Sequence, residues 1–366
     1  MPSPIPLYDV RQDHAGIEDD YCRALRGTIE RGRFVLGPEV ERFETLFART
    51  LGVAHCVGVN SGTDAIILAL KGLGIGPGDE VITTPFTFIA TAEAIVRAGA
   101  RPVFADVEPG SLCLSPDASA AAITPRTRAV LTVHIFGHCG DFGGLIDLCR
   151  ARGIHLVEDA CQAVGSIWLG RHLGTVGAAG AFSFYPTKNL SALGDAGAVV
   201  TNDPDLAAGI RCLRSHGLGA DGRQRQFGHN SRLDELQAAF LNLRLGRLEA
   251  ENNRRRELAR RYDENLEQLV GSVRGSPDCR SNYHQYGIRS PRRDDLRRFL
   301  NDRGIGTGLY YAAPVHRQPA LAYAGPALPE AEAACAEVLA LPIRPSLADT
   351  EQDDIIGAIS EFRRPK

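Results

Sequence analysis

The sequence predicts an α/β protein with a large, mostly parallel sheet flanked by helices and a smaller C-terminal α/β unit. Two observations lead to this prediction. Between about residues 50 and 203, short apolar runs alternate with helical segments, a pattern typical of a parallel sheet with helices on both faces. The last two apolar runs follow each other closely around Lys188, which indicates a hairpin and therefore a mixed sheet.

The elements of the large unit follow from local patterns of residues. Strands are expected where β-branched, aromatic or small apolar residues form short runs between turn residues. The predicted strands are 55–59, 80–84, 101–107, 129–135, 154–158, 181–185 and 196–201. Between them, helices are predicted at 63–72, 89–98 and 142–152.

A long helix is predicted to begin near Arg232. Leu233, Leu236, Phe240 and Leu243 recur at helical spacing and form one apolar stripe. The helix is expected to continue through the arginine-rich stretch 250–269, whose charges we interpret as a solvated face rather than an anion site. A smaller α/β segment follows. We therefore predict two domains, 1–250 with the N-terminal segment included, and 251–366.

Composition argues against several classes of function. The formal net charge of −3 provides no electrostatic basis for binding nucleic acid or an anionic membrane. Nine cysteines, without a C-x-x-C pair, argue against a disulfide framework or a zinc site. The sequence shows neither a secretory leader nor an apolar run long enough to span a bilayer. We expect a cytoplasmic protein without a metal, membrane or nucleic-acid partner.

Lys188 is notable because lysine is rare in this chain. Of 41 lysines and arginines, only Lys71, Lys188 and Lys366 are lysines. Lys71 follows an apolar helical run and Lys366 is the last residue, so both look incidental. A lysine can lose its proton and attack a carbonyl, whereas an arginine remains charged. Lys188 is either the exposed tip of a loop or, if the protein forms a Schiff base, the reactive amine.

Two further motifs lie where a predicted strand ends. In VNSGTDAIILAL (59–70) a strand leads directly into a helix, and the free N–H groups of that turn suit a phosphate; simple capping by Ser61 or Thr63 is the alternative. In HLVEDACQAVG (155–165), Asp159 ends a strand at the edge where open α/β sheets bind ligands. Asp159 could hold a protonated ring nitrogen and Gln162 an adjacent oxygen, unless Asp159 only caps a helix.

Aromatic and polar residues complete the set of candidates. Phe86 and Phe88 are expected at a strand end rather than deep in the core, where an aromatic ring can stack on a planar ligand. Taken alone, however, core packing is the better explanation for both rings. Asn230 and Arg232 lie in a polar loop before a helix, where they could bind a ligand or simply begin the helix.

Taken in this order, the motifs resemble those of fold type I pyridoxal-phosphate enzymes. The residues within the motifs are similar to those of the sugar aminotransferases of the DegT/DnrJ/EryC1/StrS family. The matching stretches extend from about residue 7 to 360. They are GPEVERFE, NSGTDA, GPGDEVITTPFTFIATAEAI, VHIFGHCGD, VEDACQAVG, FSFYPTKNLSALGDAGAVVTND, RSHG, NSRLDELQAAFL and LPIRPSL. The resemblance implies a fold type I transferase.

The resemblance also implies roles for individual residues. Lys188 would hold pyridoxal 5′-phosphate as a Schiff base and, with Asp159, carry the catalysis, with pyridoxamine 5′-phosphate as the intermediate cofactor form. Asp159 would pair with the pyridine nitrogen, Gln162 would lie near the phenolic oxygen, and Phe88 would stack on the ring. The phosphate would be bound by Gly62, Thr63, Ser183 and, across the interface of a homodimer with shared active sites, Asn230.

The substrates implied by the resemblance are L-glutamate as donor and a nucleotide-linked keto-deoxysugar as acceptor. The chain departs from many members at His138, where they have glutamine, and at Tyr310-Tyr311, where they have His-Tyr. The second departure lies in a stretch that resembles a substrate-facing loop. Candidate substrate ligands are Arg232, Tyr310, Tyr311 and His316. The motif NSRLD at 230–234 resembles that of members acting on 3-keto sugars and favours a dTDP-3-keto-6-deoxyhexose as acceptor. Sugar nucleotides with a 4-keto group and cyclitol ketones are the alternatives.

Three rival interpretations are weaker. A nicotinamide enzyme needs a G-x-G-x-x-G between a strand and a helix, whereas the match at 217–222 follows a helical segment. A dehydratase of the family would carry histidine in place of Lys188. A non-catalytic regulator that binds the cofactor or a sugar is the alternative from another class of function. Two features argue against it: the presence of Lys188, Asp159 and Gln162 together, and the lack of an attached DNA-binding segment.

Overall fold

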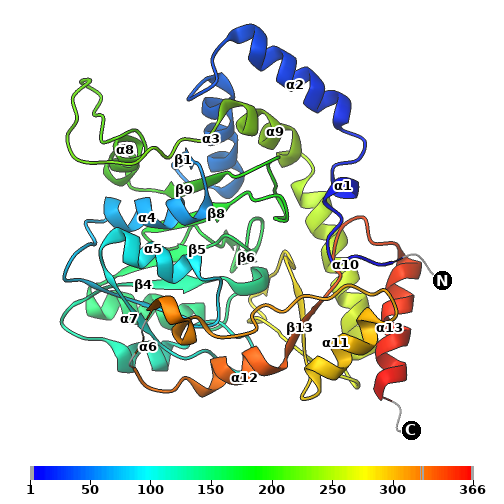
Figure 1. Cartoon of the computed structure of the whole chain (residues 1–366). Coiled ribbons are helices and arrows are strands. Elements are labelled where there is room, and N and C mark those ends of the chain that lie inside the picture. The colour runs from blue at the N-terminus through cyan, green and yellow to red at the C-terminus, as the bar shows by residue number, and fades with distance from the viewer. Residues whose placement is uncertain (1–3, 322, 324, 364–366) are drawn as a thin grey trace.

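The computed structural model describes residues 4–321, 323 and 325–363 (Figure 1). A seven-stranded sheet with the spatial order β1-β9-β8-β5-β4-β2-β3 forms the centre of the larger unit. Its strands are β1 (His55–Val59), β2 (Glu80–Thr83), β3 (Arg101–Phe104), β4 (Thr127–Val133), β5 (His155–Asp159), β8 (Ala179–Ser183) and β9 (Gly197–Thr201). β9 is antiparallel to both its neighbours and the remaining pairs are parallel, which confirms the predicted hairpin and mixed sheet.

Helices cover both faces of this sheet and create two apolar layers. Because neighbouring side chains of a strand point to opposite faces, Ala181 packs on one side and Phe182 on the other. The Phe182 side is covered by α3 (Pro38–Leu51), α7 (Phe142–Arg152) and α9 (Glu235–Leu245). The Ala181 side is covered by α4 (Gly62–Gly72), α5 (Ala90–Ala98) and α8 (Pro204–Leu213).

The smaller unit is built around a three-stranded antiparallel sheet with the order β10-β12-β13. Its elements are β10 (Gly271–Ser272), β12 (Tyr286–Arg289), β13 (Val338–Leu341), α10 (Leu248–Leu266), α11 (Arg293–Asn301) and α13 (Asp349–Arg363). The remaining elements are α1 (Val10–Asp13), α2 (Glu18–Arg31), α6 (Pro116–Ala122), α12 (Pro329–Glu337), β6 (Ile167–Trp168), β7 (Arg171–His172), β11 (Cys279–Arg280) and the 3₁₀ turns η1 (Ile135–Gly137), η2 (Val315–Arg317) and η3 (Pro319–Leu321). In the described part of the chain, no helix has an apolar stretch that would reach across a bilayer.

The N-terminal segment packs on the smaller unit, although the predicted division assigns it to the larger one. Ile5 is buried in the apolar cluster of the smaller unit. Its N–H donates to the carbonyl of Gly304 at 2.9 Å, and its carbonyl accepts from the N–H of Gly306 at 2.8 Å. The boundary near residue 250 remains a prediction.

The prediction of one long helix from Arg232 is wrong, since two helices, α9 and α10, are separated by Gly246 and Arg247. Residues 230–234 cannot be helical because Asn230 bridges to Ser215 and Asp234 bridges to Val35. α9 begins instead at Glu235, whose buried carboxylate accepts from three N–H groups at the start of α3, at 2.7 to 3.2 Å.

Candidate active site

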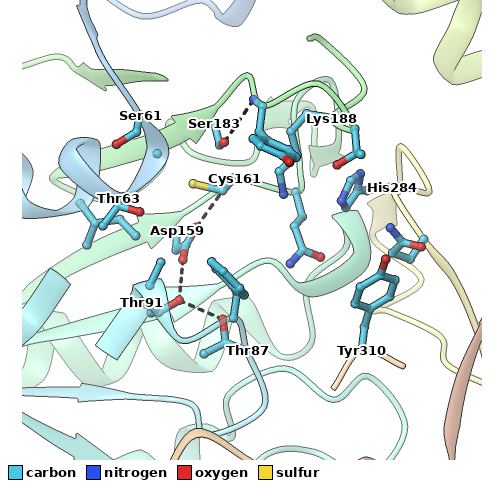
Figure 2. A pocket seen from close by; sticks show the side chains of 18 of the residues that line it. Ser61, Thr63, Thr87, Thr91, Asp159, Cys161, Ser183, Lys188, His284 and Tyr310 are labelled. Carbon is cyan, nitrogen blue, oxygen red and sulfur yellow. Dashed lines mark hydrogen bonds between the residues drawn. The ribbon is translucent and has the colours of Figure 1, made fainter. Parts of the chain in front are cut away.

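A cavity of about 580 Å³ opens at the C-terminal edge of the central sheet (Figure 2). We call it the sheet-edge cavity. Asp159 reaches it from the end of β5 and Ser183 from the end of β8, while the first turns of α4 and α5 face it from the other side. Tyr8, from the N-terminal segment, and Tyr310 close it from the smaller unit. Parallel strands place ligands at this edge.

Lys188 lines the sheet-edge cavity from the turn that follows β8. Its N–H donates to the carbonyl of Tyr185 at 2.8 Å, which tightens the turn and directs the side chain inward. Burial lowers the pKa of the Lys188 amine, although the charges of Cys161 and Asp159 act in the opposite direction. An amine that loses its proton more readily is a better nucleophile toward a carbonyl.

Asp159 has a fixed orientation at the base of the cavity. Its Oδ2 accepts from Thr91 Oγ1 at 2.8 Å, and its Oδ1 accepts from the N–H of Cys161 at 3.2 Å. Thr91 in turn contacts Thr87 at 2.9 Å. The backbone after β5 forms a turn rather than a helix, so Asp159 is not an N-cap. A carboxylate held here can pair with the protonated nitrogen of an aromatic ring.

The side-chain amide of Gln162 is also oriented. Its Oε1 accepts from the N–H of Phe136 at 2.8 Å, so its NH₂ group faces the cavity and donates to the hydroxyl of Tyr311 at 3.2 Å. Burial raises the pKa of the Tyr311 hydroxyl, which therefore keeps its hydrogen. Gln162 and Tyr311 offer hydrogen-bond donors to an oxygen of a bound ring.

The first turn of α4 is shaped for close approach of an anion. A side chain at Gly62 would place Cβ 2.6 Å from Ser183 Cβ and 2.8 Å from Cys161 Sγ, so only glycine fits. Gly62, Thr63 and Ser183 all line the cavity, and the N-terminus of a helix attracts a phosphate. Ser61 does cap α4, accepting from the N–H of Asp64 at 3.1 Å, so capping and anion binding coexist.

Phe86 and Phe88 have different environments. The side chain of Phe88 is 57 % exposed and lines the cavity, with its ring centroid 6.4 Å from that of Tyr311. Phe86 is fully buried and packs edge-on against Phe136 and Tyr311. The expectation that both rings stay out of the core is therefore wrong for Phe86, which supports the cavity wall from behind.

Three predicted residues lie outside the sheet-edge cavity. Asn230 and Arg232 line an adjoining cavity of about 650 Å³, which shares Ser61 and Asp195 with the first. His316 is buried elsewhere: its Nε2 lies 3.1 Å from Glu332 and its ring packs beside Phe104 and Tyr323. The structure thus does not bring His316 to the substrate space, because η2 turns its ring into the core.

Several lining residues were not anticipated from the sequence. Tyr8 accepts from Gln285 Nε2 and donates to the hydroxyl of Tyr310 at 2.9 Å. His284 and Thr91 also line the cavity. Thr91 has a local signal, since it lies in the first turn of α5, the helix that follows Phe88. Tyr8, His284 and Gln285 have none, because only long-range packing brings them to the site.

The cavity fits the cofactor implied by the sequence resemblance. A buried amine suits an aldehyde, an oriented carboxylate suits a ring nitrogen, an exposed aromatic face suits a planar ring, and a helix N-terminus closed to any Cβ suits a phosphate. Lys188, Asp159, Phe88 and Gly62 provide these four features within one cavity.

Comparison with known proteins gives a consistent result. The model of the DegT/DnrJ/EryC1/StrS aminotransferase family matches residues 16–360. The chain is 44 % identical over 363 residues to the dTDP-3-amino-3,4,6-trideoxy-alpha-D-glucose transaminase of Streptomyces venezuelae, covering 98 % of this chain and 96 % of that protein. It is 40 % identical over 367 residues to a pleiotropic regulatory protein of Geobacillus stearothermophilus, covering 98 % and 99 %. The crystal structure of S. venezuelae DesV with a ketimine intermediate superimposes with a TM-score of 0.97 at 43 % identity, covering 100 % of both chains.

Proposed function

The chain belongs to the DegT/DnrJ/EryC1/StrS aminotransferase family, whose aminotransferases depend on pyridoxal 5′-phosphate, and on this premise we propose its substrates. It transfers the amino group of L-glutamate to a nucleotide-linked keto-deoxysugar, for which a dTDP-3-keto-6-deoxyhexose is our choice. The observation that carries the reaction type is the convergence of Lys188, Asp159 and Gln162 on one cavity.

The residues of this chain divide the work as follows. When bound, pyridoxal 5′-phosphate supplies an electron sink for the charge that develops on the amino-bearing carbon. Lys188 Nζ would hold the aldehyde, and the same amine is placed to take up and return a proton at that carbon. Asp159 would keep the ring nitrogen protonated, and Gln162 would donate to the ring oxygen. The first turn of α4 would hold the phosphate.

The choice of a 3-keto sugar rests on the environment of Ser231. Its side chain is completely buried, and its hydroxyl donates to Asn60 Oδ1 at 3.2 Å. Asn60 directly precedes the Ser61-Gly62 turn. Family members that act on 4-keto sugars often have a tyrosine at the position of Ser231. A tyrosine here would have to displace Asn60 or fill the adjoining cavity. The name of the S. venezuelae relative, a 3-amino-sugar transaminase, agrees with this choice.

We expect kcat/KM for a 3-keto nucleotide sugar to exceed that for the 4-keto isomer by about a hundredfold. A shift of about 1 Å in the reacting atoms is enough for such a difference. Both isomers, and a cyclitol ketone for comparison, are supplied with L-glutamate, and NMR locates the new amine. Preferential amination at the 4-position would refute the argument from Ser231 and leave the reaction type intact.

We further propose that the active site is completed across a homodimer. Lys188 is the one lysine or arginine among the described residues that line the sheet-edge cavity, yet the substrates carry phosphates and carboxylates. Asn230 and Arg232 lie in the adjoining cavity beside Ser61. Near it, Val35 is exposed. The loop between α8 and α9 extends from the body (Figure 1) and carries the fully exposed Phe227. These surfaces suit a second copy of the chain.

Replacing Asn230 with alanine should weaken cofactor binding at least about tenfold without dissociating the dimer, because one hydrogen bond to a charged phosphate is lost. The dissociation constant is measured by titration of the cofactor-free protein, with Asn301→Ala, on an exposed helix end, as control. Mixed dimers of Lys188→Ala and Asn230→Ala chains should recover one intact site. A monomer with full activity at micromolar concentration would contradict shared sites.

A non-catalytic regulator is the second candidate, favoured by the name of the G. stearothermophilus relative. Ligand binding alone does not require an amine of lowered pKa beside an oriented carboxylate, whereas transamination does. L-glutamate should therefore convert the bound cofactor to its amine form, visible as a change in absorbance. No conversion with the cofactor bound would favour the regulator. The cytoplasm is our proposed location, since all nine cysteines are free thiols and reducing compartments keep thiols in that state.

A further inference from the structure

His284 lines the sheet-edge cavity on the same side as Lys188 (Figure 2) and has no role in the scheme above. Its backbone is firmly held: the N–H donates to Asn282 Oδ1 at 3.1 Å. Asn282 Nδ2 donates to the carbonyls of Gln162 and Val164 at 3.1 and 2.9 Å. His284 is thereby fixed relative to the loop that carries Gln162.

The neighbour Asn189 fixes which ring nitrogen of His284 carries the hydrogen. Asn189 Nδ2 donates to the main-chain carbonyl of Asn282 at 3.1 Å and to Asn252 Oδ1 at 2.8 Å. A carbonyl can only accept, so the other atom of the amide, Asn189 Oδ1, is an acceptor. It lies 3.1 Å from His284 Nδ1, which must therefore be the protonated nitrogen.

The ring is neutral, so its second nitrogen has a free lone pair. Burial, together with the charges of Lys188 and Arg255, holds the pKa of His284 well below its ordinary value. A neutral imidazole protonated at Nδ1 leaves Nε2 as an acceptor. No protein group is within hydrogen-bonding reach of Nε2 in the described structure.

Two tyrosine hydroxyls that line the same cavity have the opposite polarity. The hydroxyl of Tyr310 accepts from Tyr8 and that of Tyr311 accepts from Gln162. Each hydroxyl therefore keeps its own hydrogen for a ligand. A keto oxygen or ring oxygen of a sugar can be bound by these donors. A sugar hydroxyl can in addition donate, and His284 is placed to receive that hydrogen.

We infer that His284 is a specificity-determining residue whose Nε2 accepts a hydrogen bond from a sugar hydroxyl next to the carbon that is aminated. The inference rests on the proposed function, because it assumes a sugar substrate. The hydroxyl lies near the reacting carbon because His284 and Lys188 share one wall of the cavity. Losing the hydroxyl leaves a buried acceptor without a partner, a cost that corresponds to about tenfold in affinity.

The test uses two substitutions with opposite geometry. In His284→Asn, the amide nitrogen can replace Nδ1 and keep the contact with Asn189, but nothing replaces Nε2. In His284→Gln, the amide reaches the position of Nε2 and the contact with Asn189 is lost. The pair therefore separates the role of the residue in the wall from its role toward the sugar.

Binding is measured by calorimetry to the pyridoxamine 5′-phosphate form of the holoenzyme, which does not react with an amino sugar. The ligands are dTDP-3-amino-3,6-dideoxyglucose and its 2-deoxy and 4-deoxy forms. The unchanged protein should bind one deoxy form about tenfold more weakly than the parent. His284→Asn should bind that deoxy form and the parent sugar with equal affinity. His284→Gln should retain part of the difference in affinity between them.

Other outcomes overturn the inference in distinguishable ways. An equal loss for all three sugars in His284→Asn would show that Nε2 serves Lys188 or the fold rather than the sugar. No difference between the sugars in the unchanged protein would also refute it. If the unchanged protein binds none of them, the proposed substrate class itself fails. Independently, ¹⁵N NMR of the holoenzyme, with the His284→Asn spectrum identifying the signal, should show Nδ1 protonated; protonation at Nε2 would refute the argument.

Discussion

Replacing Lys188 with alanine should lower kcat for transamination by at least about a thousandfold while the protein stays folded. Two functions are lost together: the covalent attachment of the aldehyde and the transfer of a proton at the reacting carbon. Proton transfer by a positioned group alone contributes about 10² to 10⁴-fold. Folding should persist because the turn around Lys188 is held by backbone hydrogen bonds, such as that from its N–H to Tyr185.

Borohydride reduction followed by peptide mapping decides the assignment. The unchanged protein should yield the reduced cofactor on the peptide that contains Lys188, and the yellow colour of the protein should disappear in the alanine variant. Colour alone is ambiguous, because phosphate and ring contacts can retain the cofactor without a covalent bond. Lys71→Ala is the matched control and should behave like the unchanged protein. An adduct on Lys71, or none, would refute the role of Lys188.

Replacing Asp159 with asparagine should lower kcat at least about a hundredfold. The amide has nearly the same shape but no charge, so it cannot hold the ring nitrogen in its protonated form, and the electron sink is weakened. The matched control is Thr91→Val, which removes the hydrogen bond to Asp159 Oδ2 but leaves the carboxylate; we expect at most about a tenfold loss.

The measurement combines steady-state kinetics with ¹⁵N NMR of labelled cofactor, which reports protonation of the ring nitrogen. That nitrogen should be protonated in the unchanged protein and in Thr91→Val but not in Asp159→Asn. If the asparagine variant retained more than a tenth of the activity with an unprotonated ring, the carboxylate would not be the group that sustains the electron sink.

The sequence predicted those parts of the fold that depend on local patterns. β1 occupies the predicted residues 55–59, and β8 and β9 form the predicted hairpin. Asp159 was identified because it ends a predicted strand, and Lys188 because lysine is rare in this chain and this one lies between two predicted strands. The predicted helix start near Arg232 is wrong, and α9 begins at Glu235. The bridge from Asp234 to Val35 joins residues far apart in the chain, and helical spacing cannot reveal such a pair.

The walls of the cavity were harder to predict than its base. Tyr8 and His284 have no motif around them, and their places depend on packing between the two units. The prediction that His316 binds the substrate is wrong. This histidine lies in a stretch that resembles a substrate-facing loop, but its ring turns inward to Glu332. Periodicity and strand ends identify positions along one element, whereas the direction of a loop side chain is decided by neighbours from elsewhere in the chain.

The docking of the N-terminal segment on the smaller unit has a consequence for biosynthesis. Residues 55–201 supply the whole central sheet, so the base of the site can form while the ribosome is still adding the second half of the chain. The segment that carries Tyr8 can dock only later, once its partners in the smaller unit exist. The carbonyl of Gly304 then accepts from the N–H of Ile5, and the Arg344 guanidinium donates to the carbonyl of Pro6 at 2.8 Å. The wall formed by Tyr8 is therefore completed only after the second half of the chain is made, whereas the base of the site, with Asp159 and Lys188, depends on the first part of the chain.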